Sequence, residues 1–171
     1  MIQIYHGNGK GKTTAAIGLT IRGVGNGMRV IFAQFLKGGE TGELRILNQL
    51  DQVQVLRNTK DLGFTFQMSD EDKEEVKKMH NETLKKVAEC IENKKVDLVV
   101  LDEVTYPYQD NLMDKKILEE LILNLPKEVE LVMTGREPAA FLLKNADYIT
   151  NMKCERHPFE QNIMARKGIE Y

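Results

Sequence analysis

The sequence predicts an α/β fold in which a mostly parallel sheet is flanked by helices. Short apolar runs alternate with longer stretches whose apolar residues recur at helical spacing, the order that consecutive βαβ units produce. The runs at 96–101 and 131–133 are almost continuously apolar, as expected of strands buried on both faces. A glycine-rich stretch at 7–14 joins the first run to the first helical pattern. The length of 171 residues and the hydrophobic content of 42% suit a single domain spanning residues 1–171.

The apolar runs predict strands at residues 2–6, 29–36, 53–56, 96–101, 130–134 and 148–152. Helical spacing predicts helices at residues 13–25, 69–93, 114–124 and 139–145. The helix at 69–93 has the clearest signals, because Ser69 and Asp72 have the spacing of a capping box and its apolar residues share one face. Residues 38–43 and 57–68 match no regular element. Loops of this length in a compact domain are more often functional than idle.

Charge, cysteine usage and hydropathy restrict the class of protein. The formal net charge is -2 and charges of both signs are interspersed, which argues against nucleic acid as the main partner. Cys90 and Cys154 are isolated, so they form neither a disulfide framework nor a Cys-x-x-Cys metal clip, and a reducing compartment is expected. The chain has no signal-peptide pattern and no apolar run of the roughly 20 residues that span a bilayer. We therefore expect a cytoplasmic protein with no membrane partner.

The most specific motif is the stretch Gly7-Asn8-Gly9-Lys10-Gly11-Lys12-Thr13-Thr14. Its glycines let backbone N–H groups approach a phosphate closely, and the helix that follows adds its amino-terminal dipole to the same site. Lys12 is expected to supply positive charge to the terminal phosphates, and the Thr13 hydroxyl can ligate Mg²⁺. The strict P-loop pattern has glycine where His6 stands here. The stretch still predicts a nucleotide-binding P-loop, in which Lys10 is either a phosphate contact or a solvated lysine.

Charged residues follow two of the expected strands. Asp102 and Glu103 end the run at 96–101, the position from which P-loop proteins hold Mg²⁺ directly or through water. One of these acids could instead cap the turn that begins at Thr105, and the sequence leaves open which of them meets the metal. Arg136 follows the strand at 130–134, at the edge where open α/β sheets bind ligands. It is either a phosphate contact or a surface arginine.

Several short sequence motifs occur in order along the chain, between Ile2 and Tyr171. They are the glycine-rich loop, Gln34-Phe35-Leu36-Lys37-Gly38, Gly42-Glu43, Gly63-Phe64-Thr65, Leu101-Asp102-Glu103-Val104-Thr105-Tyr106, Thr134-Gly135-Arg136 and Lys167-Gly168-Ile169-Glu170-Tyr171. In this combination the chain resembles the ATP:corrinoid adenosyltransferases of cobalamin biosynthesis and salvage. The resemblance implies a RecA-like P-loop fold with three layers. It also implies transfer of the 5′-deoxyadenosyl group of ATP to the cobalt of a reduced cob(I) corrinoid, with release of inorganic triphosphate.

The resemblance assigns roles to particular residues. The residues that would hold the triphosphate are Gly7, Asn8, Gly9, Lys10, Gly11, Lys12, Thr13, Thr14 and Arg136. Thr13 and Glu103 would ligate Mg²⁺, with Asp102 as the other candidate acid. Lys12 and Arg136 would stabilise the leaving triphosphate, with ATP lying in the reverse of the usual P-loop direction. Phe64 and Phe66 would pack beneath the corrin and keep the lower axial ligand off cobalt; alternatively, they are buried in the core.

Two features depart from the usual pattern of that family. Members often have an extension ahead of the first strand, whereas this sequence opens at Met1-Ile2, so that contact would be absent or supplied by a partner subunit. Phe66 stands where the family often has tryptophan, and the sequence contains no tryptophan. The resemblance further implies a homodimer and a flavin-dependent reducing protein as a partner.

A P-loop nucleoside kinase and an ATPase switch are the alternatives at this stage. Thymidine kinases with a RecA-like core usually add a four-cysteine zinc lobe, which two cysteines cannot build. The small size and near-neutral charge count against a motor. The products separate the three classes: a kinase yields ADP, a switch yields ADP and phosphate, and a transferase of this kind yields triphosphate. Transfer of a carbon centre needs no general acid or base, so His6, His80 and His157 are expected to be packing or surface residues.

Overall fold

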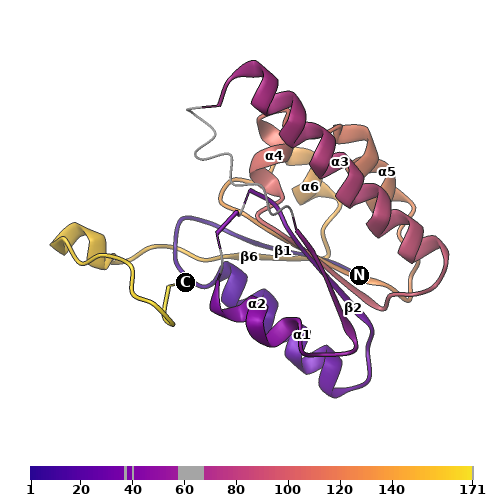
Figure 1. Ribbon diagram of the computed structural model, residues 1–171, viewed down its shortest axis with the longest axis horizontal. Helices are drawn as coiled ribbons and strands as arrows, with labels where there is room; N and C mark the ends of the chain where they lie inside the picture. Colours follow the sequence, from indigo (N-terminus) through magenta and orange to yellow (C-terminus); the bar gives the residue numbers. More distant parts are fainter. Residues whose placement is uncertain (37, 40, 58–67, 171) are drawn as a thin grey trace.

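The computed structural model describes residues 1–36, 38–39, 41–57 and 68–170 (Figure 1). The strands are β1 (Ile2–His6), β2 (Val30–Gln34), β3 (Val53–Arg57), β4 (Leu98–Asp102), β5 (Glu130–Thr134) and β6 (Tyr148–Asn151). The α-helices are α1 (Lys12–Gly25), α2 (Gly42–Leu47), α3 (Asp70–Glu92), α4 (Thr105–Gln109), α5 (Lys115–Leu123) and α6 (Ala140–Lys144). A 3₁₀ helix, η2, covers Pro158–Gln161.

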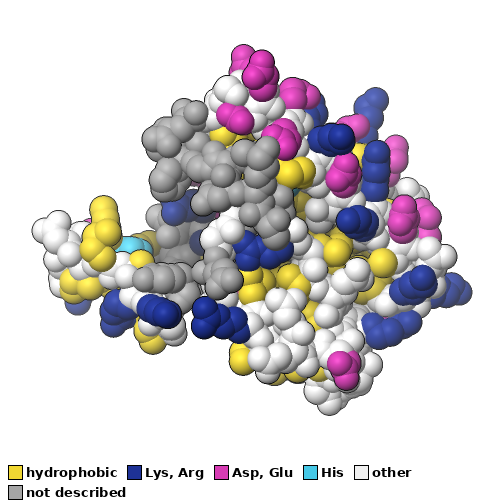
Figure 2. All heavy atoms as spheres, in the orientation of Figure 1, with side chains coloured by type: hydrophobic (Ala, Val, Ile, Leu, Met, Phe, Trp, Pro, Cys, Tyr) yellow, Lys and Arg dark blue, Asp and Glu magenta, His cyan; other side chains and the backbone are white. Residues whose placement is uncertain are grey.

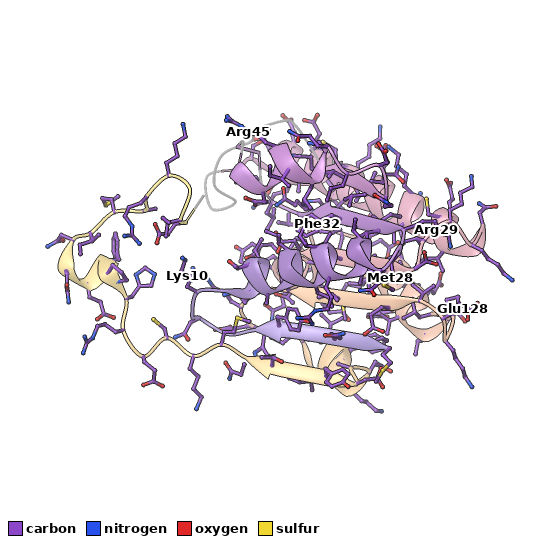
Figure 3. All side chains as sticks on the ribbon, turned by 90° about the horizontal axis from the view of Figure 1, so that it is seen from below. Lys10, Met28, Arg29, Phe32, Arg45 and Glu128 are labelled. Atoms are coloured by element: carbon purple, nitrogen blue, oxygen red, sulfur yellow. The ribbon has the colours of Figure 1, made fainter. Side chains whose placement is uncertain are left out.

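The described strands form one parallel sheet in the order β3-β2-β4-β5-β1-β6. Because every strand runs the same way, all the carboxyl ends meet at one edge of the sheet. Strand β5 lies between β1 and β4, so the strand that leads into the glycine-rich loop is not adjacent to the strand that ends in Asp102. In Figure 3 Lys10 marks the loop end of the molecule, and Met28, Arg29 and Glu128 lie at the opposite end.

Helices cover both faces of the sheet and make it the middle of three layers. Figure 1 shows α1 and α2 on one face and α3, α4, α5 and α6 on the other. Phe32 packs with Ala16 and Leu47 in the core on the first face. Leu84 of α3 and Leu118 of α5 belong to the core on the second face. The three-layer α/β fold predicted from the sequence is therefore confirmed.

Every predicted strand and helix is present, and the differences lie at their ends. Strand β2 ends at Gln34, two residues before the predicted end, because the chain turns at Leu36, whose φ is 55°. Ser69 and Asp72 form the capping box of α3, in which each side chain accepts a hydrogen bond from the other residue's backbone N–H, at 3.1 Å and 3.0 Å.

Two short α-helices and the 3₁₀ helix η2 were not predicted. Helix α2 begins at Gly42, so the stretch 38–43 is not entirely irregular. Helix α4 begins at Thr105, where the sequence suggested a turn; Pro107 is tolerated because it lies in the first helical turn. Of the stretch 57–68, Arg57 ends β3, and residues 58–67 lie outside the described part.

The segment after β6 extends away from the sheet. Figure 2 shows it as a projection with apolar side chains on its surface, while acidic and basic side chains intermingle over the rest of the visible face. Phe159 and Met164 of this segment are 65% and 70% exposed. Within the described part of the chain, no helix combines the length and the apolar character needed to cross a membrane.

Candidate nucleotide-binding and metal site

The carboxyl edge of the sheet gathers the glycine-rich loop and the polar ends of three neighbouring strands. The loop connects β1 to α1, and Thr13 lies in the first turn of α1. Gln34, Asp102 and Thr134 end β2, β4 and β5, which are adjacent in the sheet. These three side chains are buried, in contrast to the exposure typical of polar residues at a sheet edge. A buried polar cluster of this kind requires internal hydrogen bonds or a ligand.

The glycines of the loop are required by close backbone contacts. A Cβ atom on Gly7 or Gly9 would lie 2.5 Å or 2.7 Å from the carbonyl oxygen of Met152, which follows β6. The Gly9 amide donates to that same carbonyl at 2.7 Å, and the Gly7 amide donates to the Arg136 carbonyl at 2.9 Å. Gly11 precedes α1 with φ of 118°, a conformation that costs glycine little. The loop is therefore held in place by the segments after β5 and β6.

Lys12 is folded over the loop. Its Nζ donates to the carbonyl oxygens of Gly7 at 2.8 Å and Gly9 at 2.9 Å, and the residue is 8% exposed. These two carbonyls hold the ammonium at the mouth of the loop, beside the first amides of α1, which have no partner within the helix. An anion bound there would meet the lysine charge, the first amides of the helix and the positive end of the helix dipole together.

Asp102 is the centre of the buried hydrogen-bond cluster. Its Oδ1 accepts hydrogen bonds from the Thr13 hydroxyl at 2.8 Å and the Thr134 hydroxyl at 2.7 Å, and the residue is fully buried. The Thr134 oxygen in turn accepts from the backbone N–H of Glu103 at 2.8 Å. This chain of bonds connects the ends of β4 and β5 to the start of α1. It fixes the position of the Thr13 hydroxyl relative to the loop.

Glu103 and Arg136 lie beside this cluster. Glu103 has φ of 60°, a left-handed conformation that is uncommon for a residue with a side chain and that recurs at functional sites. Arg136 contacts the loop through its carbonyl oxygen, and the residue itself is exposed. Thr14 is also exposed. The site residues predicted from Gly7 to Thr14, together with Asp102, Glu103 and Arg136, therefore meet at one edge of the sheet. Phe64 and Phe66 lie outside the described residues.

The oxygen atoms at this edge fit a magnesium ion that is shared with a nucleotide. Among the described residues, no group of three or more His, Cys, Asp or Glu side chains could hold a metal by itself. Mg²⁺ commonly takes one or two protein oxygens, several waters and substrate phosphate oxygens. Thr13 and the acids at 102–103 offer such oxygens next to the loop. The buried Gln34 side chain lies beside Asp102, and its carbonyl oxygen has no hydrogen-bond partner among the described residues, which leaves room for a further polar group.

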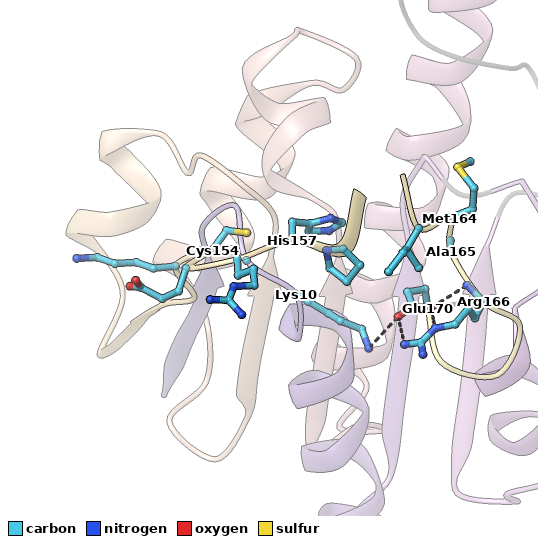
Figure 4. Close-up of a pocket in the computed structure, with 13 residues that line it drawn as sticks. Lys10, Cys154, His157, Met164, Ala165, Arg166 and Glu170 are labelled. Atoms are coloured by element: carbon cyan, nitrogen blue, oxygen red, sulfur yellow. Dashed lines mark hydrogen bonds and ion pairs between the residues drawn. The ribbon is translucent and has the colours of Figure 1, made fainter. Parts of the chain in front are cut away.

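A cavity of about 520 Å³ lies between the loop and the segment after β6. Figure 4 shows that Lys10 points into it, toward Glu170. Lys10 forms a 3.7 Å ion pair with Glu170, which also pairs with Arg166 at 3.1 Å. The hydrogen bonds from Arg166 lower the pKa of Glu170 to about 2, so this carboxylate stays ionised near neutral pH. Lys10 therefore has a carboxylate partner on a side chain that is 55% exposed, and its contact with phosphate stays a prediction.

Thr134 and Gln34 were not among the predicted site residues, although both belong to the motifs that carry the family resemblance. Gln34 was a polar residue at the end of an apolar run, and this was the signal that could have found it. The bond of Thr134 to Asp102 depends on β5 lying next to β4, which no local sequence pattern indicates.

The strand order, with β5 between the P-loop strand and the strand that ends in Asp102, defines a P-loop protein of the RecA-like class. The fold is similar to that of a KaiC-like protein from Pyrococcus horikoshii, with a TM-score of 0.53 and 11% identity, over 91% of this chain and 73% of that one. At that identity the likeness concerns the fold alone.

Sequence comparison identifies the family. The family model described as ATP:corrinoid adenosyltransferase BtuR/CobO/CobP matches residues 1–171, and the chain belongs to this family of transferases. A corrinoid adenosyltransferase of Pseudomonas aeruginosa is 30% identical over 172 residues, covering 100% of this chain and 83% of the relative. A corrinoid adenosyltransferase of Salmonella typhimurium is 32% identical over 180 residues, covering 100% of this chain and 85% of the relative.

Proposed function

We propose that this chain transfers the 5′-deoxyadenosyl group of ATP to the cobalt of a reduced cob(I) corrinoid and releases inorganic triphosphate. The proposal is supported by a family match over residues 1–171. The observation that carries it in the structure is the P-loop with Lys12 folded over it and Thr13 bonded to Asp102. This arrangement offers a polyphosphate both positive charge and backbone amides.

The proposed step forms one bond and breaks one bond. The cobalt of the reduced corrinoid donates an electron pair to the 5′ carbon of ATP, and the C5′–O bond breaks with its electron pair leaving on triphosphate. No proton has to be moved at the reacting carbon, so the step needs no general acid or base. What it needs is alignment of the two substrates and stabilisation of the charge that develops on the leaving group.

The residues of the site would supply that stabilisation. The loop amides and Lys12 would hold the triphosphate, with Lys10 and Arg136 contributing further positive charge at its ends. Thr13 and Glu103 would hold Mg²⁺, while Asp102, engaged with the Thr13 and Thr134 hydroxyls, would orient Thr13. The ion would add positive charge to the leaving triphosphate when bound. Phe64 and Phe66, outside the described residues, are proposed to form the apolar surface under the corrin.

Two further parts of the proposal rest on family resemblance alone, a homodimer and a flavin-dependent reducing protein that supplies cob(I). The proposed cytoplasmic location rests on the cysteine usage and the hydropathy of the sequence.

An anaerobic mixture of the protein, Mg-ATP and chemically reduced cob(I)inamide tests the proposed transfer. We expect absorbance to report a light-sensitive cobalt–carbon bond that forms only when protein and ATP are both present. ATP turnover without that bond would contradict the proposal and favour a kinase or an ATPase switch.

A further inference from the structure

Gln34 is a buried amide whose hydrogen-bonding capacity is largely unused. It ends β2, pairs in register with Asp102 of β4, and is 3% exposed. Its Nε2 lies 3.5 Å from Asp102 Oδ2 and 3.5 Å from Glu43 Oε1. Within the part of the chain that the structure describes, its Oε1 has no hydrogen-bond partner.

This arrangement is energetically unfavourable unless another group donates a hydrogen bond to Gln34 Oε1. Contacts of 3.5 Å are long for N–H···O hydrogen bonds, which have a usual length of about 2.9 Å. A buried carbonyl oxygen without a donor costs roughly 1–3 kcal/mol, and folded proteins rarely leave one. Turning the amide over would not help, because both carboxylates can only accept, so the nitrogen end has to face them.

The neighbours of Gln34 indicate which kind of group donates to its Oε1. Asp102 uses its Oδ1 for the hydroxyls of Thr13 and Thr134, so the same carboxylate connects Gln34 to Thr13, the threonine proposed to hold Mg²⁺. The unpaired Oε1 needs a donor, and a carboxylate or a phosphate oxygen is not one. Water bound to a divalent cation is a donor with two protons, and Mg²⁺ keeps several such waters when it binds a nucleotide.

We propose that Gln34 is a positioning residue for the hydrated Mg²⁺ that accompanies ATP. Its Oε1 accepts a hydrogen bond from a metal-bound water, and its Nε2 bridges the carboxylates of Asp102 and Glu43. Glu43 lies in the first turn of α2, so the bridge also connects this short helix to the metal site. The inference rests on the proposed binding of Mg-ATP, and it does not depend on the identity of the acceptor that receives the adenosyl group.

The test is the Mg²⁺ dependence of ATP binding in the variant Gln34→Met, which keeps the shape of the side chain and removes its polar atoms. We expect the Mg²⁺ concentration for half-maximal ATP binding to rise about 10–100-fold, the usual effect of removing a hydrogen-bond partner of a metal site. ATP affinity in EDTA and the thermal midpoint should stay close to the wild-type values. Gln54→Met, the same change on an exposed residue of the neighbouring strand β3, is the matched control and should leave the Mg²⁺ dependence unchanged.

Glu43→Gln provides a second measurement that is independent of the buried substitution. Glu43 is only partly buried, so this variant should fold even if Gln34→Met does not. The substitution weakens the contact between Gln34 Nε2 and residue 43 and leaves Gln34 Oε1 in place. We therefore expect the Mg²⁺ concentration for half-maximal ATP binding to rise less than in Gln34→Met.

The outcomes separate this inference from the proposed function. If folded Gln34→Met had the same Mg²⁺ dependence as the wild type, the inference alone would be overturned. If Gln34→Met does not fold, the same result for Glu43→Gln would overturn it. Equal weakening of ATP binding with and without Mg²⁺ would also overturn it, because Gln34 would then contact the nucleotide directly. Wild-type protein that binds no Mg-ATP would overturn both the inference and the proposed function.

Discussion

At the scale of single residues, the geometry of the site depends on the hydrogen bonds that the buried carboxylate of Asp102 accepts. Asp102 is fully buried, and a buried charge is tolerated only when it is paired or hydrogen-bonded. The Thr13 and Thr134 hydroxyls donate hydrogen bonds to this carboxylate, and as a consequence Thr13 has a fixed position. A threonine already held in place beside the P-loop would reduce the reorganisation that the proposed binding of Mg-ATP requires.

Replacement of Lys12 by alanine removes the charge that is folded over the loop. We expect Lys12→Ala to lower the rate of adenosyl transfer at least about 100-fold, since we propose that this ammonium stabilises charge on the leaving triphosphate. Anaerobic rate measurements with cob(I)inamide check this. Lys10→Ala is the control: Lys10 is about half exposed and should have a smaller effect. Equal losses in the two variants would contradict the separate roles assigned to these lysines.

Replacement of Phe66 by alanine tests the proposed apolar surface under the corrin. We expect Phe66→Ala to slow transfer to corrinoids that keep a lower base and to spare cob(I)inamide, which has none. The comparison requires transfer rates for both acceptors under the same reducing conditions. The same loss with both acceptors would remove the proposed role in displacing the lower ligand.

At the scale of elements, α3 begins with a capping box that can be tested by itself. Ser69→Ala removes the acceptor of the Asp72 amide and should lower the free energy of unfolding by about 1 kcal/mol. Ser69→Thr keeps the hydroxyl and should lose less. Urea unfolding at neutral pH measures both. If the two variants were equally destabilised, the loss would come from packing of the side chain and not from the cap.

Helix α3 also makes stability depend on pH through His80. The ring packs on Phe35 with its centroid 5.1 Å away, and Nδ1 donates to the Leu112 carbonyl at 2.8 Å. Burial lowers the pKa of His80, and its hydrogen bond to Leu112 only partly opposes this effect. The folded state therefore binds a proton less readily than the unfolded state, so His80 contributes stability that is present above about pH 6.5 and is lost as the pH falls.

We expect the urea midpoint of the wild type to fall between about pH 7 and about pH 5 more steeply than that of His80→Gln. This variant keeps a hydrogen-bond donor and does not titrate in this range. Identical pH profiles would show that His80 does not titrate differently in the folded and unfolded states.

At the scale of the whole molecule, the sequence predicted the layers of the fold better than it predicted neighbours within the sheet. Apolar runs and helical spacing are local properties, so β1 and β5 were predicted with their observed ends. Strand order is a long-range property. The insertion of β5 between β1 and β4 brings Thr134 to Asp102 and could not be predicted from periodicity.

The same distinction applies to the site. Gly7–Thr14 were predicted as a phosphate loop because their spacing in the sequence already implies the geometry. The role of Gln34 could not be predicted, since it depends on the register that pairs Gln34 with Asp102 and on α2 bringing Glu43 close. Helix α2 itself has only six residues, too few for a clear helical period.

The central claim is that this edge of the sheet holds ATP so that its ribose carbon, and not its terminal phosphorus, is attacked. Phosphorus NMR of the phosphate products, recorded beside the yield of adenosylated corrinoid, tests it most directly. We predict intact inorganic triphosphate in equal amount to the new cobalt–carbon bond, with no ADP. ADP formed in step with ATP loss, without adenosylated corrinoid, would contradict the claim.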